Sequence, residues 1–517
     1  MDVLTEDQAE VATWLADASS HAGRPATVER IDTHSASVFL AGALAYKMKR
    51  AVRYSFLDFS TLDLRRQACK AEVRLNRRTA PGLYRGVTPV TREPSGQLAL
   101  GGEGTPVEWL VVMDRFPQDC LLDRVAQAGR VTPAVVSALA DAIASFHAGA
   151  TPTPHRGGVR GMSEVITDNA RALADATGRL SAATVSTVST VTEACAQALA
   201  AHGCRLEARR AGGFVRQCHG DLHLRNIVLL DDAPTLFDAI EFNEDFACID
   251  VWYDTAFLLM DLLARSLPAE ANALFNQYLL RTSDVGGLPL VPFFLGCRAA
   301  VRAKTSLASA SLQTDDGRRR DLMTRARDYL ELAAQVLAPG PCRVIAIGGL
   351  SGTGKSTLAA LLAPRLGSAP GAVVVRSDVQ RKVLLQRPLV ERLGPDGYTA
   401  AVTGEVYRSA LVRAADVLNE GWPVIVDATF LDARWRHAIA DVARHAGVPF
   451  TGLWLEAPPE HLVDRLRRRV GDASDATEAV LFRQLVRESG GIAWTRLDAD
   501  GDPESVARAA LQVLSLG

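Results

Sequence analysis

The sequence predicts an α/β protein of more than one domain, and three observations support this. The chain has 517 residues, enough for two or three domains of roughly 100–200 residues each. A helical pattern over 318–337 ends at Pro339-Gly340-Pro341, because proline cannot continue a helix and glycine favours its end. Directly after this break, an apolar strand leads into a glycine-rich turn. We therefore predict one domain over 1–335 and a second over 340–517.

Composition narrows the class of protein. Apolar residues make up 48% and charged residues 22% of the chain, which excludes a mostly disordered protein. The formal net charge of −2 argues against a strong cationic surface for non-specific nucleic-acid binding. The best apolar run, Ala256–Leu263, contains Asp261, so we expect no membrane partner. The eight scattered cysteines lack any CxxC pair, and the N-terminus lacks a secretory pattern; we expect reduced thiols and a cytoplasmic location.

The first domain begins with alternating strands and a helix and then becomes mainly helical. Helical spacing dominates from Pro133 onward, and the Ala-, Ser- and Thr-rich stretch 176–202 is interpreted as a helical surface segment. The expected earlier elements are strands at Val38–Leu40 and Ala45–Met48, a helix over 62–78, and strands at Val87–Val90 and Trp109–Met113.

The segment CHGDLHLRNIVL, residues 218–229, is the most specific motif of the first domain. It places Asp221 and Asn226 five residues apart on a tight loop. Kinase catalytic loops use this spacing, because the Asp orients or deprotonates the acceptor hydroxyl while the Asn carbonyl ligates Mg²⁺. Further on, TLFDAIEF presents Asp238 at a strand end, suited to chelate Mg²⁺ on the ATP phosphates.

This part of the chain, roughly residues 25–310, resembles the aminoglycoside phosphotransferase family, a branch of the protein-kinase-like fold. The resemblance implies a two-lobed α+β domain, with a small lobe over about 25–113 and a large lobe over about 114–335. It implies that Asp221 is the catalytic base and that Asn226 and Asp238 are Mg²⁺ ligands. A strand lysine paired with a helix glutamate would contact the α- and β-phosphates of ATP; we assign Lys47, rather than Lys49, and Glu72. The segment EWLVVMDRF, 108–116, would be the hinge whose backbone binds adenine.

Two features differ from this pattern or leave alternatives open. The segment THSASVFLAG precedes the lysine where many kinases carry G-x-G-x-x-G, so a phosphate-covering glycine loop is not implied. The acids of 241–254 could form an acidic acceptor pocket. Asp250 and Asp254 could equally be helix-capping or core-pairing residues. The family fold also serves kinases of small metabolites, so the acceptor is not assigned to aminoglycosides.

In the second domain, GLSGTGKS at 349–356 fits the pattern G-x-x-x-x-G-K-[ST]. It follows the apolar strand Val344–Ile347 and precedes a helix over Thr357–Leu362. Glycines at these positions let backbone N–H groups turn inward on phosphate oxygens, aided by the helix N-terminus. Lys355 can reach the β- and γ-phosphates, and the Ser356 hydroxyl can ligate Mg²⁺. The expected cofactor-binding residues are Gly349, Ser351, Gly352, Thr353, Gly354, Lys355, Ser356 and Thr357.

Two further strands of this domain end in acids. The strand Ala372–Val375 delivers Asp378 and, three residues on, Arg381, which share a helical face. Asp378 can accept a proton from a substrate hydroxyl and Arg381 can hold an anionic group, although Asp378 could instead only cap the helix. The strand in WPVIVDATF ends in Asp427, an acid expected near Mg²⁺ or, alternatively, a strand-end cap.

A basic helical segment follows in EHLVDRLRRRVGDASDA. Arg465, Arg468 and Arg469 lie on it, ahead of a Gly-Asp-Ala-Ser stretch. Arginines on a mobile lid can neutralise charge during phosphoryl transfer, and Arg465 and Arg469 are the candidates, with the arginine that points inward left open by the sequence. The alternative is a solvated basic face.

Residues 343–500 resemble the small P-loop kinases: gluconate kinase, polynucleotide 5′-hydroxyl kinase and zeta-toxin relatives. The resemblance rests on GLSGTGKST, RSDVQRK, VIVDATF and RLRRRVGDASDA, and implies a three-layer α/β domain with a parallel sheet. In the polynucleotide kinase pattern D-x-x-R, the Asp is the general base and the Arg contacts substrate, positions matched by Asp378 and Arg381. Asp427 is followed by Ala428-Thr429 instead of a second acid, which favours kinase chemistry over that of an ATPase motor.

Together these motifs predict a bifunctional ATP-dependent phosphotransferase that uses Mg²⁺ and transfers the γ-phosphoryl group to hydroxyl groups of small molecules. Nucleic acid is expected only as a 5′-hydroxyl acceptor of the second domain. One alternative is a single active kinase domain with the other acting as an ATP-binding regulatory module. Another is a non-enzymatic ATP-binding protein, which would not need the bases Asp221 and Asp378.

Overall fold

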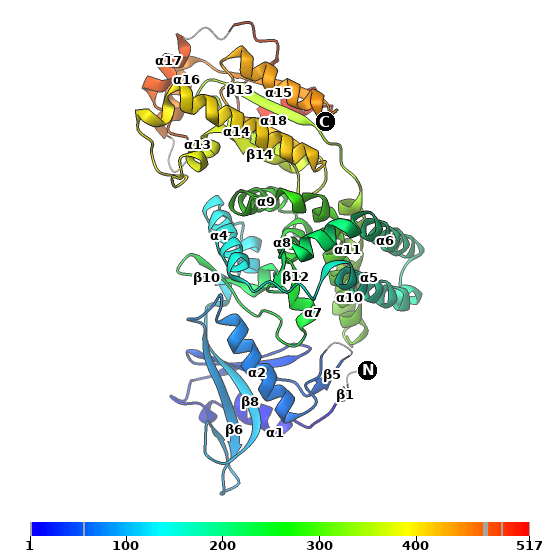
Figure 1. The fold of residues 1–517 in the computed structure, drawn as a ribbon. Helices are drawn as coiled ribbons and strands as arrows, with labels where there is room; N and C mark the ends of the chain where they lie inside the picture. Colours follow the sequence, from blue (N-terminus) through cyan, green and yellow to red (C-terminus); the bar gives the residue numbers. More distant parts are fainter. Residues whose placement is uncertain (1–2, 55–56, 469–473, 487–489, 516–517) are drawn as a thin grey trace. The chain divides into compact units, whose positions relative to one another are not determined.

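The structure is a computed structural model that describes residues 3–54, 57–468, 474–486 and 490–515. Figure 1 traces the chain from blue to red. The chain divides into two compact units. The first comprises residues 1–176 and 196–261, and the second comprises residues 177–195 and 262–517. Each unit is built around its own sheet.

The main sheet of the first unit has six strands, each antiparallel to its neighbours. Two expected strands are longer than the sequence pattern suggested, because Ala36 and Lys49 at their ends pair with each other. In sheet order the strands are β2 (Val28–Asp32), β3 (Ala36–Ala41), β4 (Leu44–Lys49), β8 (Thr105–Asp114), β6 (Tyr84–Arg92) and β7 (Leu98–Leu100). The short strands β1 (Val3–Leu4) and β5 (Val52–Arg53) pair beside it.

A helix covers each face of this sheet because the strands alternate apolar side chains between the faces. On one face, α1 (Ala9–Ala16) buries Leu15 against Phe39, Tyr46 and Met48. On the other face, α2 (Leu62–Asn76) buries Cys69 and Val73 against strand residues that include Leu40 and Val111. The Thr61 side chain caps α2 by accepting the N–H of Leu64. As a result, the side chains of Lys47 on β4 and Glu72 on α2 meet in the layer between the sheet and α2.

The rest of the first unit is mainly helical, with one short hairpin and one pair of sequence-distant strands on either side of the motif residues. The hairpin of β10 and β11 separates Asn226 from Asp238, and the pairing of β9 with β12 precedes the long buried helix α8. The elements are α3 (Leu122–Gln127), α4 (Pro133–Gly149), α5 (Gly158–Ala176), α6 (Ala182–Ala211, whose first part lies in the second unit), β9 (Val215–Gln217), β10 (Ile227–Leu230), β11 (Ala233–Leu236), α7 (Glu244–Ala247), β12 (Cys248–Asp250) and α8 (Val251–Ala264).

The sheet of the second unit has five strands, all parallel, which confirms the predicted parallel sheet. Its central strand is buried along its whole length, as expected for a parallel strand covered on both faces. In sheet order the strands are β14 (Val373–Arg376), β15 (Val424–Asp427), β13 (Val344–Gly349), β16 (Phe450–Glu456) and β17 (Thr495–Asp498).

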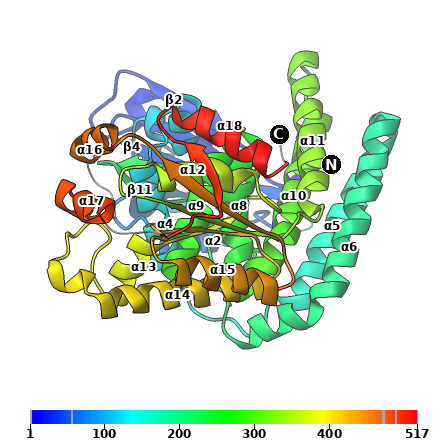
Figure 2. The ribbon, with the colours of Figure 1, turned by 90° about the horizontal axis from the view of Figure 1, so that it is seen from above.

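Helices cover both faces of the parallel sheet (Figure 2). On one face, α12 (Lys355–Leu362) and α18 (Pro503–Val513) bury Leu358, Leu362 and Leu511 against Ile345 and Ile425. The other face carries α14 (Ala400–Asn419) and α15 (Ala433–His445). Two shorter helices, α13 (Ser377–Leu384) and α16 (Pro459–Arg468), follow β14 and β16, and α17 (Glu478–Leu485) precedes β17. This is the three-layer arrangement expected from the sequence.

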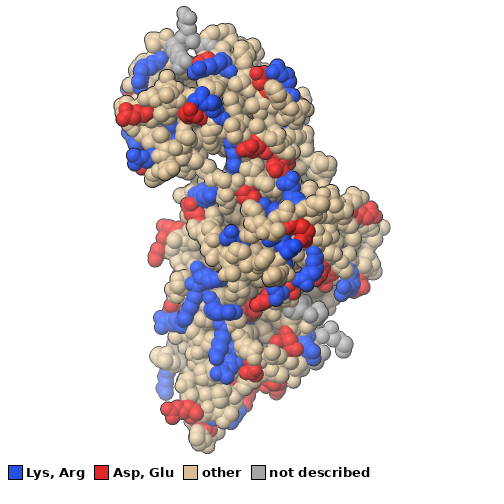
Figure 3. Space-filling view, in the orientation of Figure 1, with Lys and Arg blue, Asp and Glu red and all other residues tan. Residues whose placement is uncertain are grey.

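The second unit also contains α9 (Pro268–Thr282), α10 (Val291–Ser311) and α11 (Asp316–Leu337). Among the described residues, one stretch, Val285–Ser311, is long and apolar enough to cross a membrane by composition, a segment that the sequence prediction did not single out. Within the window tested, 67% is buried inside the protein, as in a core helix. Lys or Arg and Asp or Glu side chains are interspersed over the face drawn in Figure 3, consistent with totals of 57 and 59.

Candidate active sites

The loop that carries Asp221 is held in a compact turn. It follows β9 and runs into the 3₁₀ turn Leu224–Asn226. The Asn226 amide nitrogen donates to the Asp221 carbonyl oxygen at 2.9 Å and to its carboxylate Oδ2 at 3.0 Å. The amide nitrogen of Asn226 is therefore committed to Asp221, which leaves its carbonyl oxygen as the ligand atom. The structure thus brings together the first two predicted site residues.

Asp254 on α8 fixes the backbone of this loop. Its buried carboxylate accepts the N–H of His219 at 3.0 Å and the N–H of Gly220 at 2.9 Å. The next turns of α8 extend this hold, because Asp261 accepts the N–H of Leu224 at 3.0 Å. Asp250 forms a buried two-point ion pair with Arg209 instead. Of the two roles left open by the sequence, Asp250 and Asp254 therefore take the structural one.

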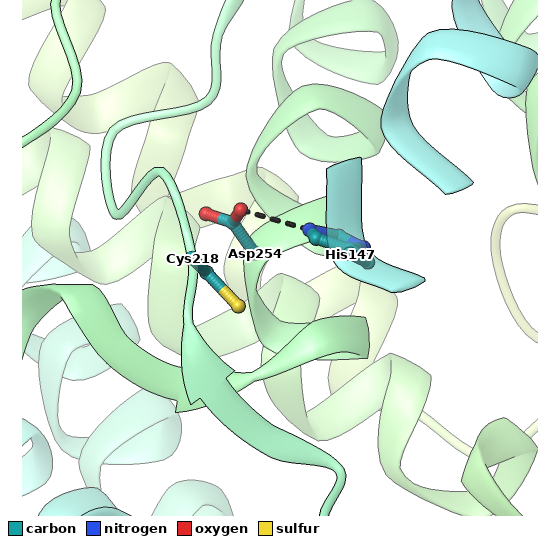
Figure 4. Close-up of side chains that lie close together, drawn as sticks. All are labelled: His147, Cys218 and Asp254. Atoms are coloured by element: carbon teal, nitrogen blue, oxygen red, sulfur yellow. Dashed lines mark hydrogen bonds and ion pairs between the residues drawn. The ribbon is translucent and has the colours of Figure 1, made fainter. Parts of the chain in front are cut away.

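Figure 4 shows His147, Cys218 and Asp254 close together, a grouping of three potential metal ligands. His147 Nε2 lies 3.0 Å from Asp254 Oδ2. The Cys218 thiol donates to the Ile249 carbonyl oxygen at 3.4 Å, and burial raises its pKa well above the ordinary value. A protonated thiol is a poor metal ligand. We therefore interpret this cluster as support for the loop that carries Asp221 and not as a metal centre.

Lys47, Glu72 and Asp238 form a charge network in which Glu72 is buried and the Asp238 side chain remains 40% exposed. The Lys47 ammonium donates to Glu72 Oε1 at 2.8 Å and to Asp238 Oδ1 at 2.5 Å. Desolvation lowers the pKa of Lys47, but the charges of Asp238 and Glu72 outweigh it and raise that pKa well above its ordinary value. Desolvation likewise raises the pKa of Asp238, and Lys47 overcomes this so that the net shift is downward. The lysine is therefore cationic and the aspartate anionic at neutral pH.

A second lysine joins the network. Lys49, two residues from Lys47 on the same face of β4, forms ion pairs with Glu72 and with Glu241. Lys47 and Lys49 were alternatives from the sequence, and the contact with Asp238 distinguishes Lys47. Glu241 was not identified from the sequence. It lies three residues after Asp238, and its pairing depends on how the chain folds back onto β4.

The segment around Asp238 is fixed by α2 and by the start of β6. The backbone N–H of Asp238 donates to the Tyr84 hydroxyl at 3.1 Å, and that of Ala239 donates to Asn76 Oδ1 at 2.8 Å. Asp238 has φ +62°, in the left-handed region that non-glycine residues rarely adopt. Such conformations are kept when the surroundings determine them and are common at functional sites.

In the second unit, residues 349–354 form the expected glycine-rich loop ahead of α12. Gly349, Gly352 and Gly354 all have positive φ, at +138°, +89° and +88°. A Cβ on Gly349 would lie 2.6 Å from the Leu455 carbonyl oxygen, so this position requires glycine. The Lys355 ammonium donates to the Leu350 carbonyl oxygen at 2.7 Å, and the Thr353 hydroxyl donates to the same atom at 2.8 Å. Thr357, the third residue of α12, is exposed.

Ser356 and Asp427 meet at the carboxyl ends of β13 and β15. The Ser356 hydroxyl donates to Asp427 Oδ2 at 2.5 Å, so two oxygen groups of the kind that Mg²⁺ prefers lie together. Arg376, at the end of β14, places Nε 3.5 Å from the same carboxylate oxygen. This arginine was not among the predicted site residues, although its place one residue before α13 could have indicated it.

Asp378 lies close enough to Asp427 and Arg376 for their charges to shift its pKa. Desolvation raises its pKa, a hydrogen bond with Ser474 lowers it, and the charge of Asp427 raises it further. Arg376 and Lys355 act in the opposite direction, and the net shift is upward. Because a raised pKa brings a carboxylate nearer to neutral pH, Asp378 is better suited to exchange a proton than an ordinary aspartate.

Arg381 is buried and turned toward the segment that follows α13. It donates to the Gly397 carbonyl oxygen at 2.7 Å, and its guanidinium lies 4.6 Å from the centre of the Tyr398 ring. Lys382 pairs with Asp475 at 2.7 Å, and Asp475 also accepts the Tyr398 hydroxyl at 2.7 Å. These contacts link α13 to the residues ahead of α17, a connection that the sequence analysis did not identify.

The helix α17, which follows the segment expected to form a lid, contacts the glycine-rich loop through a glutamine. Gln484 on α17 accepts the N–H of Ser351 at 2.8 Å and donates to the Ser351 hydroxyl at 3.0 Å. Arg465 donates to the Ala499 carbonyl oxygen at 2.8 Å, beside β17. Arg468 is exposed. Arg469 lies outside the described residues.

Comparison with known proteins agrees with this geometry. Residues 65–289 match the model of the "Phosphotransferase enzyme family" (APH), and residues 344–488 match an "AAA domain" model (AAA_33). The chain joins two kinase-type domains. The resemblances inferred from the motifs, and the fold class of a kinase-like first part followed by a P-loop part, are thereby confirmed. Kinase-family domains support phosphotransferase activity and imply use of ATP.

Relatives and solved structures cover both parts. An uncharacterized protein of Mycobacterium tuberculosis is 29% identical over 481 residues, 92% of each chain, and one of Mycobacterium bovis matches equally. A choline/ethanolamine kinase family protein from Mesorhizobium loti is 16% identical, covering 63% of this chain and 99% of its own at TM-score 0.39. A gluconokinase from Sinorhizobium meliloti is 20% identical, covering 34% and 94% at TM-score 0.26.

Proposed function

We propose that the chain is a bifunctional phosphotransferase, with one ATP-dependent site in each kinase-type domain and a hydroxyl group as the acceptor at both. The observation that carries this proposal is the convergence of a complete set of kinase side chains at each site. Asp221, Asn226, Asp238 and the Lys47–Glu72 pair supply the first set. The glycine-rich loop with Lys355, Ser356, Asp427 and Asp378 supplies the second.

At the first site, Asp221 accepts the proton of the acceptor hydroxyl as its oxygen attacks the γ-phosphorus of ATP. The bond from that phosphorus to the oxygen bridging the β- and γ-phosphates breaks, and ADP leaves. Lys47 binds the α- and β-phosphates, held in place by Glu72. Because Asp254 fixes the loop backbone at two N–H groups, Asp221 is positioned before substrate arrives, which lowers the entropic part of the barrier.

At the second site, backbone N–H groups of the loop 349–356 and the Lys355 ammonium hold the phosphates. Asp378 takes the proton of the second acceptor hydroxyl, and the same bond exchange at the γ-phosphorus follows. Arg381 shapes the acceptor side by holding residues 395–398 in place. The guanidinium of Arg376 lies beside Asp427 and balances part of the acidic charge there.

The donor sets fit Mg²⁺, which prefers oxygen ligands. Asn226 and Asp238 would hold it at the first site, and Ser356 and Asp427 at the second, where the metal would neutralise charge on the phosphates. We propose small molecules as acceptors for both sites, with a 5′-hydroxyl oligonucleotide as the one nucleic-acid candidate for the second. A cytoplasmic location is part of the same proposal, since both sites need ATP.

The test is a transfer screen with ATP labelled on its γ-phosphate against sugars, aminoglycosides, nucleosides and 5′-hydroxyl oligonucleotides. The full chain is compared with Asp221→Asn and Asp378→Asn. Each acceptor should lose its labelling in one variant and keep it in the other. An acceptor that is still labelled by both variants would contradict the assigned bases. If only one of the two substitutions changes the labelling of any acceptor, the proposal is reduced to a single catalytic domain.

A further inference from the structure

The edge strand of the second sheet, β14, leads into the helix α13 that carries Asp378, and it has an unusual neighbour. In the described part of the chain, the sheet ends at β14, which pairs with β15 on one side. The N–H of Val373 bonds toward that side, to the Pro423 carbonyl oxygen at 3.0 Å. The carbonyl of Ala372 and the N–H of Val374 therefore point to the outer edge. An edge strand of this kind exposes unpaired backbone groups unless something covers them.

Two asparagines of α9 cover this edge. Asn276 accepts the Val374 N–H at its Oδ1 at 2.7 Å and donates from Nδ2 to the Ala372 carbonyl oxygen at 3.1 Å. A residue of a parallel neighbouring strand would use its own N–H and C=O in the same way, on the two residues that flank position 373. Asn272, which is buried, donates to the carbonyl oxygens of Pro370 and Ala372 at 3.0 and 3.1 Å.

Apolar contacts accompany these hydrogen bonds. Phe275 lies between the two asparagines in the sequence, and its ring centre is 5.6 Å from that of Trp422. Both rings are buried. The Trp422 indole N–H in turn donates to the Gly371 carbonyl oxygen at 2.9 Å, at the approach to β14. Arg413 of α14 donates to the carbonyl oxygen of Leu279, further along α9, at 3.3 Å.

We infer that α9 takes the place of a sixth strand of the second sheet and that Asn272 and Asn276 position β14, whose end presents Arg376 and Asp378. α9 lies inside residues 65–289, the segment matched to the phosphotransferase family. The second kinase-type domain therefore borrows its edge partner from the sequence of the first. α9 begins at Pro268, four residues after α8 ends, and α8 is the helix whose Asp254 and Asp261 hold the first catalytic loop.

Hydrogen exchange on the full chain tests the interface directly. In Asn276→Leu, which removes the amide but keeps the number and branching of the side-chain heavy atoms, peptides covering 370–376 should exchange at least about 10-fold faster, because the Val374 N–H loses its acceptor. Gln277→Leu is the matched control, since Gln277 is on the same helix and bonds Arg281 instead. Peptides covering β16 should not change in either variant.

If Asn276→Leu fails to fold, Asn276→Asp is compared with Gln277→Glu. The carboxylate keeps an acceptor for Val374 but loses the donor to the Ala372 carbonyl, so exchange over 370–376 should still be faster than in the control. Exchange over 370–376 that equals the matched control, in whichever pair folds, would overturn the inference.

The positioning of Asp378, which rests on the proposed function, needs a catalytic readout. The probe is slow transfer of the γ-phosphoryl group of ATP to water by the second site, with Lys355→Ala defining the background. Asn276→Leu should lower kcat about 3- to 10-fold and leave the KM for ATP within about twofold, because the phosphate loop lies on β13. An unchanged kcat, where Asp378→Asn lowers it, would overturn the positioning. An unchanged kcat in both variants would contradict the role proposed for Asp378 and not the interface, which the exchange rates decide.

Discussion

The two proposed sites would hold phosphate groups by different means. At the first, the charged groups come from β4, α2 and two loops of the kinase-like domain, so that Lys47 meets Asp238 across 191 residues of sequence. At the second, we expect backbone N–H groups and Lys355 of the single loop 349–356 to bind the phosphates. A phosphate site made by side chains needs the whole fold to assemble it. A site made by backbone needs only glycines at the right positions and the helix that follows.

The sites also differ in what supports the catalytic acid. Asp221 is on a loop whose backbone is fixed by the buried carboxylate of Asp254. Asp378 is at the start of a helix, after an edge strand that depends on α9 for its outer hydrogen bonds. The loop of Asp221 is held by a residue of its own domain. The strand before Asp378 is held by α9, a segment that precedes the second domain in the sequence. Changes at the two acids should therefore have different consequences.

The largest expected effect is on chemistry at the first site. Asp221→Asn should lower turnover there by about 10²-fold or more, since general-base catalysis contributes roughly 10²–10⁴-fold. Nucleotide affinity should change little, because the phosphate contacts come from Lys47 and the metal ligands. Steady-state kinetics and equilibrium ATP binding on the same protein check both parts. Asp231→Asn, the same change at an exposed turn, is the control; loss of ATP binding in step with activity would show the role to be wrong.

A large effect on stability should come from the acid that holds the loop. Asp254→Asn removes a buried charged acceptor of two backbone N–H groups and turns an amide nitrogen toward one of them. The free energy of unfolding should fall by about 3 kcal/mol, since each unsatisfied buried donor costs roughly 1–3 kcal/mol. Urea denaturation measures this, with the exposed Asp245→Asn as control. A stability equal to that of the control would mean that Asp254 does not hold the loop.

The contrast between the sites explains what the sequence could predict. The glycine-rich loop, the parallel sheet and the order of Asp221, Asn226 and Asp238 are local patterns, and the structure contains each of them. Lys47 is distinguished from Lys49 only by its contact with Asp238, and that contact is set by tertiary structure. Gln484 and Asn276 carry no motif, because a single amide in a helix has many uses. Arg465 was assigned from its charge, whereas its direction depends on where β17 ends.

The pH dependence of the second site should reflect the environment of Asp378. Desolvation raises its pKa, and Arg376 is one of the groups that limit the rise. Since the base must be unprotonated, activity should fall on acidification at a higher pH than for an ordinary aspartate. Arg376→Gln removes a cation that favours the charged form, so the acid limb of the kcat profile should move to higher pH. The first-site profile serves as control, and an acid limb that stays in place or moves to lower pH would argue against Asp378 as the base.

The smallest expected effect concerns Gln484. Its two hydrogen bonds to Ser351 order the phosphate loop, and each is worth about 0.5–1.5 kcal/mol. Gln484→Leu should weaken ATP binding at the second site by roughly 3- to 10-fold. Arg483→Leu, the preceding and exposed residue, is the control. Tighter ATP binding in Gln484→Leu would show instead that the glutamine competes with the nucleotide.

The central claim, two nucleotide sites in one chain, is tested most directly by the stoichiometry of ATP binding to the intact protein. Isothermal titration calorimetry with ATP and Mg²⁺ should count two ATP per chain. Lys355→Ala should reduce the count to one and leave the remaining affinity unchanged, because Lys355 serves only the second site. A count of one for the unmodified chain, or a Lys355→Ala chain that binds none, would contradict the account.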